Sequence, residues 1–313
     1  MGLLQQSSKG VLEQEPVIVL YGEGGLGKST FLAEAEDAYA LDIEGGTANL
    51  NIERSPKPES FDQVVSWLDE LIAEKRSFKA YGIDGIDTLE QLLFKKICKE
   101  HGNAKSIVDA AQGYGNGFKI AIEKWFELHA KLNVLRHKKK AKIIIIGHSV
   151  VSTFNDPTTD KGYDRFSIKL QESAKVSAAR AWFDFADCVL FAKREVLERG
   201  NDEKKSKLRR AIDANDGENI IFTQGRAAFD AKNRYGLPFK MPLRYAAFEE
   251  AMKRGPRTVK QIKAAIDSLV SEIKDTELVS KIKENVAEVG DDSINLRVIE
   301  ERIIEILAEE RKG

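Results

Sequence analysis

The chain has 313 residues, of which 42% are hydrophobic and 32% charged, a balance typical of a globular protein and not of a disordered chain. Its 49 Lys and Arg nearly cancel its 50 Asp and Glu, which excludes a global basic field that draws nucleic acid from a distance. The two cysteines, Cys98 and Cys188, lie far apart without partner spacing, so neither a disulfide framework nor a zinc site is expected.

The length suits one large α/β domain with a smaller appendage, because single cores stop growing near ~250–300 residues. Apolar runs such as Ile143 to Ile146 are far shorter than the ~20 residues that span a bilayer. The N-terminus also lacks a charged start followed by an apolar run. We therefore expect no membrane contact and a cytoplasmic protein.

The first predicted element is an apolar strand, Pro16 to Tyr21, followed by glycines and then by a helix over Ser29 to Ala35. Between them, Gly22 to Ser29 matches G-x-x-x-x-G-K-S in full. In this pattern backbone N–H groups turn toward phosphates, Lys28 reaches the β- and γ-phosphates, and Ser29 ligates Mg²⁺. The sequence thus predicts a site for ATP and Mg²⁺ formed by Gly22, Glu23, Gly24, Gly25, Leu26, Gly27, Lys28, Ser29 and Thr30.

Carboxylates follow the next two predicted strands. The strand over 40–44 ends in Glu44, a candidate to position the attacking water, although one Glu before two glycines is more often a loop charge. After an amphipathic helix over 61–75, the strand over 79–84 ends in Asp84, a candidate to hold Mg²⁺ through its waters. Asp87 competes with Asp84, but its position suggests the N-cap of a helix over 87–101.

The later elements complete an α/β pattern. A long helix over about 118–136 precedes the buried strand over 143–146, and such alternation implies a parallel sheet covered on both faces. From Asp187 the pattern changes to a β-meander with strands over 188–192, 208–212, 219–223 and 227–231. Helical periodicity then dominates to the end. We expect an N-terminal extension over 1–15, an ATPase core over 16–252 and a helical domain over 253–313.

Four segments in the right order resemble RecA-like recombination ATPases, and most closely phage-encoded, stand-alone RecA-like proteins of the single-strand-annealing group. They are the P-loop, Leu41 to Glu44, Ile144 to His148 and Ala231 to Lys240. The resemblance covers about 16–245 and implies a RecA-like P-loop NTPase core: a mostly parallel sheet flanked by helices, with the β-meander after it. It implies that Glu44 is the catalytic glutamate and His148 a polar sensor, where RecA itself has glutamine.

The same resemblance assigns Lys232 and Arg234 to the catalytic set, as cations that reach the γ-phosphate of a neighbouring subunit. A cation supplied in trans stabilises charge on the transferring phosphoryl group and contributes about 10³–10⁵ in rate. We therefore expect self-association, into a filament if the head-to-tail interface stays open and into a ring if it closes. The alternative is a solvated basic strand end.

The stretch from Ser149 to about Ser177 is long and polar for a connection, and long loops of this kind are usually functional or disordered. In RecA-like proteins the equivalent loop contacts single-stranded DNA, and this one offers cations and aromatic rings suited to that role: Lys161, Arg165, Lys169, Lys175, Phe154, Tyr163 and Phe166. A second candidate is Gly113 to Lys119, with Tyr114 and Phe118. The basic runs 136–142 and 204–210 are, each alone, typical of solvated faces.

Three functions remain open on the sequence. The first is an ATPase that assembles on single-stranded DNA in phage recombination or annealing. The second is a ring-forming replicative helicase or loader motor, which shares the P-loop and a similar Lys-x-Arg finger. The third is a nucleotide-switched scaffolding module whose turnover no DNA stimulates.

Overall fold

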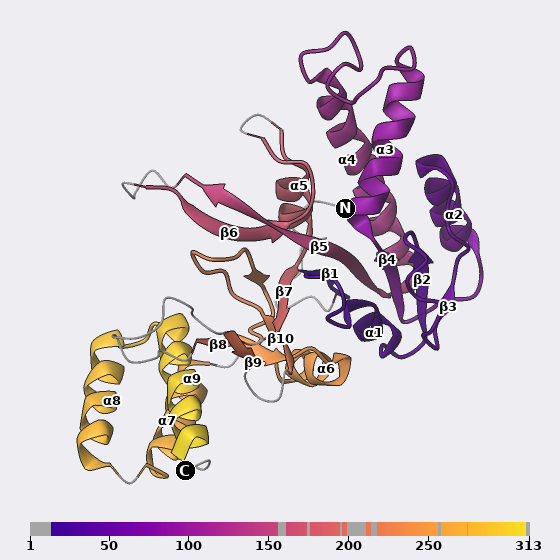
Figure 1. Ribbon diagram of the computed structural model, residues 1–313. Helices are drawn as coiled ribbons and strands as arrows, with labels where there is room; N and C mark the ends of the chain where they lie inside the picture. The colour runs from indigo at the N-terminus through magenta and orange to yellow at the C-terminus, as the bar shows by residue number, and fades with distance from the viewer. Residues whose placement is uncertain are drawn as a thin grey trace, which may run out of the picture. The chain divides into compact units, whose positions relative to one another are not determined.

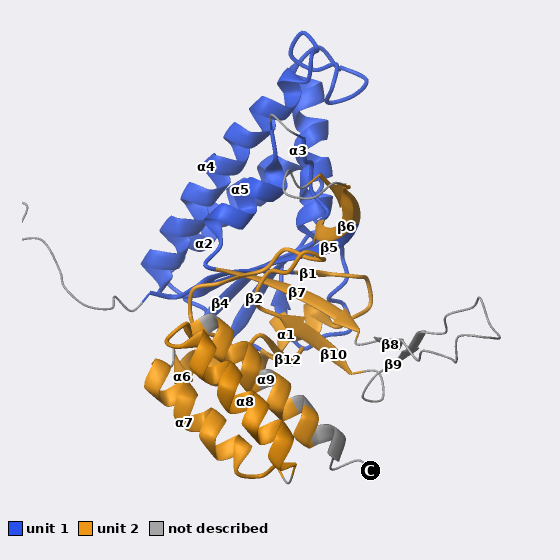
Figure 2. Ribbon diagram, turned by 90° about the vertical axis from the view of Figure 1, so that its left-hand side faces the viewer, with its two compact units in different colours: residues 1–20, 35–150, 168–187 blue, residues 21–34, 151–167, 188–313 orange. Residues whose placement is uncertain are grey.

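The computed structural model describes residues 14–155, 161–173, 176–194, 196–198, 211–213, 218–255, 258–273 and 275–310. The protein is an α/β fold in which a mixed, mostly parallel sheet is flanked by helices (Figure 1), as the sequence predicts. The chain passes repeatedly between two compact units (Figure 2). The first comprises residues 1–20, 35–150 and 168–187, and the second comprises 21–34, 151–167 and 188–313.

The first unit is built on five strands, of which the first and the longest continue into the second unit. Their order across the sheet is β1 (Val17–Gly22), β5 (Lys142–Phe154), β4 (Ala80–Asp84), β2 (Ala38–Asp42) and β3 (Glu53–Arg54). The pairs β4·β5, β2·β4 and β2·β3 are parallel. All residues of β4 are buried, as expected for a strand covered on both faces. In the register Asp84 lies beside Asp42, so two carboxylates end neighbouring strands.

Four helices of the first unit pack together on one side of these strands (Figure 2): α2 (Phe61–Ala73), α3 (Ile86–Glu100), α4 (Asn116–Lys139) and α5 (Ala178–Phe185). Ser60 and Ser177 cap α2 and α5, because each hydroxyl accepts a backbone N–H of the first turn. The buried indoles of Trp125 and Trp182 meet edge to face, with ring centroids 5.4 Å apart. This contact joins α4 to α5.

The second unit carries the remaining elements: α1 (Lys28–Ala33), β6 (Tyr163–Ile168), β7 (Cys188–Arg194), β8 (Val196–Glu198), β9 (Ala211–Asp213), β10 (Asn219–Phe222), β11 (Lys232–Asn233), β12 (Lys240–Pro242), α6 (Tyr245–Arg254), α7 (Val259–Val270), α8 (Thr276–Val289) and α9 (Ser293–Glu310). Strand β10 pairs antiparallel with both β7 and β12, and β11 pairs antiparallel with β7. Of the predicted meander strands, those over 188–192 and 219–223 are confirmed as β7 and β10, whereas β11 and β12 were not predicted.

The last three helices pack together (Figure 1). They share a core of their own. Helix α7 begins in a capping box, in which Thr258 and Gln261 satisfy each other's backbone N–H groups. The apolar faces of α7, α8 and α9 bury Ile262, Ile266, Val270, Ile273, Ile282, Leu296, Ile303 and Leu307. The helical periodicity of the sequence thus reflects burial between these helices.

Two sequence predictions about strands are wrong. Strand β5 does not stop at Ile146 but runs to Phe154 and pairs with β6, so much of the predicted loop is regular structure. The β-branched residues Val150, Val151 and Thr153 favour this extended conformation. Residues 227–231 form no strand: Phe229 makes isolated bridges with Arg226 and Phe166, and the strand β11 begins only at Lys232. Most of the predicted strand over 208–212 lies outside the described residues.

Across the part of the chain that the structure describes, none of the helices combines the length and the apolar character that a membrane span requires.

Candidate active site

The P-loop belongs to the second unit, where Gly22 to Ser29 lead from the end of β1 into α1. Gly25 and Gly27 have φ values of 76° and 94°, which L side chains rarely adopt. At Gly22 the constraint is space, because a Cβ there would lie 2.2 Å from the carbonyl oxygen of Ala192 on β7. Glycine therefore lets the main chain enter the loop beside β7.

Lys28 is the first residue of α1, and its side chain turns back over the loop that precedes it. Its Nζ donates to the carbonyl oxygens of Gly22, at 3.0 Å, and Glu23, at 2.5 Å. The residue is buried, whereas Glu23, Gly24 and Gly25 are exposed. The loop therefore presents main chain to solvent around a buried ammonium group.

Residues far along the chain hold the P-loop and α1 in place. Asn219, the first residue of β10, donates its side-chain N–H to the carbonyl oxygen of Leu26 at 2.8 Å. Phe31 of α1 packs edge to face against Tyr245 and Phe248 of α6, with ring centroids 5.4 and 5.7 Å apart. Sequence reasoning missed these supports, because nothing near Asn219 or Tyr245 distinguishes them from ordinary strand and helix residues.

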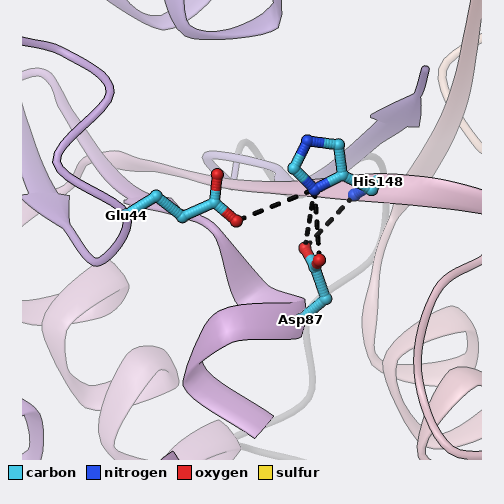
Figure 3. A group of neighbouring side chains, drawn as sticks. All are labelled: Glu44, Asp87 and His148. Carbon is cyan, nitrogen blue, oxygen red and sulfur yellow. Dashed lines mark hydrogen bonds and ion pairs between the residues drawn. The ribbon is translucent and has the colours of Figure 1, made fainter. Parts of the chain in front are cut away.

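A second group of side chains, Glu44, Asp87 and His148, meets in the first unit (Figure 3). His148 Nδ1 lies 3.2 and 3.1 Å from the two carboxylate oxygens of Asp87 and 3.7 Å from Oε1 of Glu44. The backbone N–H of His148 also donates to Asp87 Oδ1 at 3.3 Å. The structure thus brings together two predicted catalytic residues and the carboxylate that competed with Asp84.

The cluster departs from the sequence predictions in three details. Strand β2 ends at Asp42, so Glu44 lies two residues beyond it. His148 lies inside β5, at the point where burial of the strand decreases. The predicted N-cap role of Asp87 is wrong, because Gly85 is the N-cap of α3 and Asp87 lies in the first turn. A carboxylate there still interacts favourably with the helix dipole.

Asp42 fixes the turn that carries Glu44. Its buried carboxylate accepts the N–H groups of Gly45, Gly46 and Thr47, at 2.8, 3.1 and 3.2 Å, and the hydroxyl of Thr47 at 2.6 Å. Four bonds to one buried anion hold the turn in a single conformation. Sequence reasoning overlooked this role, although an Asp before a Gly-Gly-Thr turn is a recognisable signal for side-chain to main-chain bonding.

Two residues at the start of α3, its N-cap Gly85 and Thr88 in its first turn, define where the Glu44 side chain lies. Thr88 donates its hydroxyl to Glu44 Oε1 at 2.8 Å. Gly85, with φ of 101°, leaves room for the same side chain, because a Cβ there would lie 2.3 Å from Cγ of Glu44. The Glu44 side chain is therefore positioned by its hydrogen bond with Thr88 and by the space that glycine leaves at position 85.

Asp84, the predicted Mg²⁺ ligand, ends β4 and is buried.

One helical turn beyond Asp87, Glu90 is also buried and accepts the backbone N–H of Gln171 with both oxygens, at 3.1 and 3.0 Å. Burial raises the pKa of Glu90 to about 7, against an ordinary value of 4.5. Glu90 thus links α3 to the segment after β6.

The predicted finger residues, Lys232 and Arg234, flank Asn233 in the second unit. Lys232 and Asn233 form β11, beside Val189 and Cys188 of β7. The Asn233 side chain accepts the N–H groups of Tyr235 and Leu237, both at 3.1 Å. Arg297 of α9 donates to the carbonyl oxygen of Gly236, which lies between these two residues, at 2.9 Å. The finger segment is therefore an ordered turn.

The candidate DNA contacts have varied surroundings. Arg165 makes an ion pair with Asp230 and lies 5.1 Å from the Phe154 ring centroid, and Phe166 packs on Phe191. Phe118 packs on Phe94, but Tyr114 is fully exposed. Lys175 and the basic run 204–210 lie outside the described residues.

A complete G-x-x-x-x-G-K-S loop between a buried strand and a helix, in a mostly parallel sheet flanked by helices, defines the chain as a P-loop NTPase. Residues 14–235 match the AAA domain family, and the chain belongs to that family. No curated protein matches the chain. The family match indicates a nucleotide-binding ATPase and agrees with the P-loop prediction.

Proposed function

We propose that this chain is a Mg²⁺-dependent ATPase of the RecA-like type that assembles on single-stranded DNA and acts in phage DNA recombination or annealing. The observation that carries the proposal is the P-loop, with its complete motif and its ordered, exposed main chain. Membership of the AAA domain family supports the nucleotide chemistry. The DNA and recombination parts rest on the resemblance of four segments to RecA-like proteins.

The donor groups of the chain fit Mg²⁺ and a triphosphate. Mg²⁺ prefers oxygen ligands, and the Ser29 hydroxyl and the Asp84 carboxylate provide them. The N–H groups of a glycine turn suit phosphate oxygens, and Gly25 and Gly27 have the backbone angles of such a turn. When bound, Mg²⁺ neutralises charge on the phosphate oxygens.

The side chains of the chain have separate roles in this proposal. Lys28 binds and orients the β- and γ-phosphates. Glu44 orients the attacking water and accepts its proton, and Thr88 holds one of its carboxylate oxygens so that the other is available. His148, 3.7 Å from Glu44, is the polar sensor. Positioning and electrostatics of this kind account for most catalysis of phosphoryl transfer.

Lys232 and Arg234 act on the triphosphate of a neighbouring protomer in this proposal. The ordered turn around Asn233 supports it, because a finger must hold its cations in a fixed place to stabilise charge in the transition state. AAA ATPases often oligomerise, which agrees with a site completed in trans. We further propose an extension over 1–15, a core over 16–252 and a helical domain over 253–313, whose separate core supports the last boundary.

The decisive measurement is ATP turnover by the purified chain with and without single-stranded DNA, together with electron microscopy in a non-hydrolysable ATP analogue. Stimulated turnover and filaments that depend on DNA support the proposal. Rings with strand unwinding identify a helicase or loader motor instead. ATP binding without DNA-stimulated turnover indicates a nucleotide-switched module.

A mixing experiment tests the fingers. The double variant Lys232→Ala/Arg234→Ala keeps its P-loop, and Lys28→Ala keeps its fingers. Mixing the two should restore part of the turnover that each lacks alone, because mixed interfaces then contain one complete site. Absence of rescue, with both variants shown to assemble, would contradict the trans arrangement.

A further inference from the structure

We propose that Glu44, Asp87 and His148 bind one divalent transition-metal cation, with Zn²⁺ as the best-fitting ion, at a site separate from the Mg²⁺ of the triphosphate. The three residues come from three elements: the turn after β2, the first turn of α3, and β5 (Figure 3). Each offers one ligand atom, and these atoms all lie within 4.8 Å of one another.

The spacing of the donor atoms fits a coordination shell. Zn²⁺ bonds to imidazole nitrogen and carboxylate oxygen at about 2.0–2.2 Å, which places neighbouring ligands of a tetrahedron about 3.4 Å apart. His148 Nδ1 lies 3.1 Å from Asp87 Oδ2 and 3.7 Å from Glu44 Oε1. Only small side-chain adjustments are therefore needed, and water would supply the fourth ligand.

The charges of the cluster also favour a cation. Two carboxylates converge on one ring nitrogen, and a single Nδ1–H satisfies one acceptor well and not two. Lys169 offers Asp87 a second cationic group, with its Nζ 3.9 Å from the carboxylate, but the Lys169 side chain is 61% exposed. A divalent ion between the carboxylates would offset their repulsion more strongly than this distant ammonium group.

Surrounding hydrogen bonds hold two of the ligands as an outer shell does in metal sites. Thr88 holds Glu44, and the backbone N–H of His148 donates to Asp87. The side chains of Glu44 and His148 are 30% and 34% exposed, so an ion can enter from solvent and retain a water. One imidazole with two carboxylates suits Zn²⁺ or Mn²⁺, whereas Mg²⁺ prefers oxygen alone.

Binding of Zn²⁺ would occupy the carboxylate that orients water. We therefore expect Zn²⁺ to inhibit ATP turnover, a consequence that rests on the proposed function, whereas metal binding itself does not. The two are separable because binding is measured without nucleotide.

The first test is calorimetric titration of the full chain with ZnCl₂, without nucleotide and with Mg²⁺ in excess. We expect one ion per chain, and an affinity lowered by more than about tenfold in Asp87→Asn and in His148→Asn. The matched control is His101→Asn, which removes an exposed histidine and should leave the titration unchanged. No saturable binding, or binding that both ligand variants retain, would overturn the proposal.

In the second test the variant should gain a spectroscopic signal. A misfolded variant could lose metal binding, but it would not gain this signal. His148→Cys replaces the imidazole by a thiolate, and added Co²⁺ should then show a thiolate-to-metal charge-transfer band that the unsubstituted chain lacks. An identical spectrum in the two chains would overturn the site. Turnover assays complete the set: inhibition that Asp87→Asn relieves supports the consequence, whereas Zn²⁺ binding without inhibition would leave the site intact and contradict the role of Glu44.

Discussion

The P-loop and the Glu44, Asp87 and His148 cluster are specified in different ways. The P-loop is eight consecutive residues whose backbone angles and close packing are set mostly by its own glycines. The cluster combines residues 44, 87 and 148, which the parallel register of β2, β4 and β5 brings to one place. A contiguous site carries most of its conformational requirements in its own residues, with Asn219 as an added support, whereas a site made from several strands depends on every neighbour that orients it.

The largest expected effect comes from the contiguous site. Lys28→Ala should lower kcat/KM for ATP by about 10⁴ or more, because it removes a charge-assisted contact to the bound phosphates and a stabilising charge in the transition state. Steady-state ATPase assays and nucleotide titration measure this. Lys99→Ala, an exposed position on α3, is the control. Normal turnover in Lys28→Ala would refute the site.

The second prediction concerns the chemistry of the cluster. Glu44→Gln should retain Mg·ATP binding but lower kcat by about 10³, because the amide cannot accept the proton of the attacking water. Single-turnover hydrolysis together with a binding isotherm separates the two steps. The surface change Glu59→Gln should alter neither. If Glu44→Gln hydrolyses ATP at the normal rate, another residue is the base.

The third prediction tests Gly85, a neighbour that affects the Glu44 side chain by leaving space for it. Gly85→Ala should displace the Glu44 side chain, because its Cβ would lie 2.3 Å from Cγ of Glu44, and a shift of about 1 Å costs about 10² in kcat. Gly102→Ala is a matched control, since Gly102 has a similar positive φ of 74° but no atom near its missing Cβ. Equal kcat values in the two variants would show that Glu44 tolerates displacement.

The smallest expected effect concerns Glu90, the buried carboxylate that holds α3 near the cluster, and the pH dependence of stability. Because burial raises the pKa of Glu90 to about 7 from 4.5, the folded chain binds more protons than the unfolded chain between these pH values. Stability should therefore fall by about 2 kcal/mol from pH 5 to pH 7 through this group. Glu90→Gln should remove that dependence, measured by urea unfolding at both pH values, whereas the exposed change Glu123→Gln should retain it.

The sequence predicted features whose cause is local. The strand, glycine loop and helix around Lys28 follow from motif and periodicity, and the α/β class follows from apolar strands alternating with amphipathic helices. The extension of β5 to Phe154 was missed because polar residues around Val150 and Val151 suggested a loop, although their β-branching indicates a strand. Helix α6 was also missed, although it contains strong helix formers.

Features with a distant cause were not predictable. Nothing near Asp87 shows that the backbone of Gly85 starts α3 earlier and turns this carboxylate toward His148. The support of the P-loop by Asn219 joins residues 193 positions apart. Such pairings depend on strand register, which one sequence does not specify at the level of single side chains.

The turn over Gly45 to Thr47 is rich in glycine, which usually makes a backbone flexible, but its hydrogen bonds hold it in place. Gly45 and Gly46 have no side chains to restrict them, yet their amides donate to the buried Asp42 carboxylate. Amide hydrogen exchange in this turn should therefore be slow, with protection comparable to that of a strand and not of a surface loop. The backbone of this turn therefore loses most of its conformational entropy during folding. Little further entropy has to be lost to position Glu44 in each catalytic cycle.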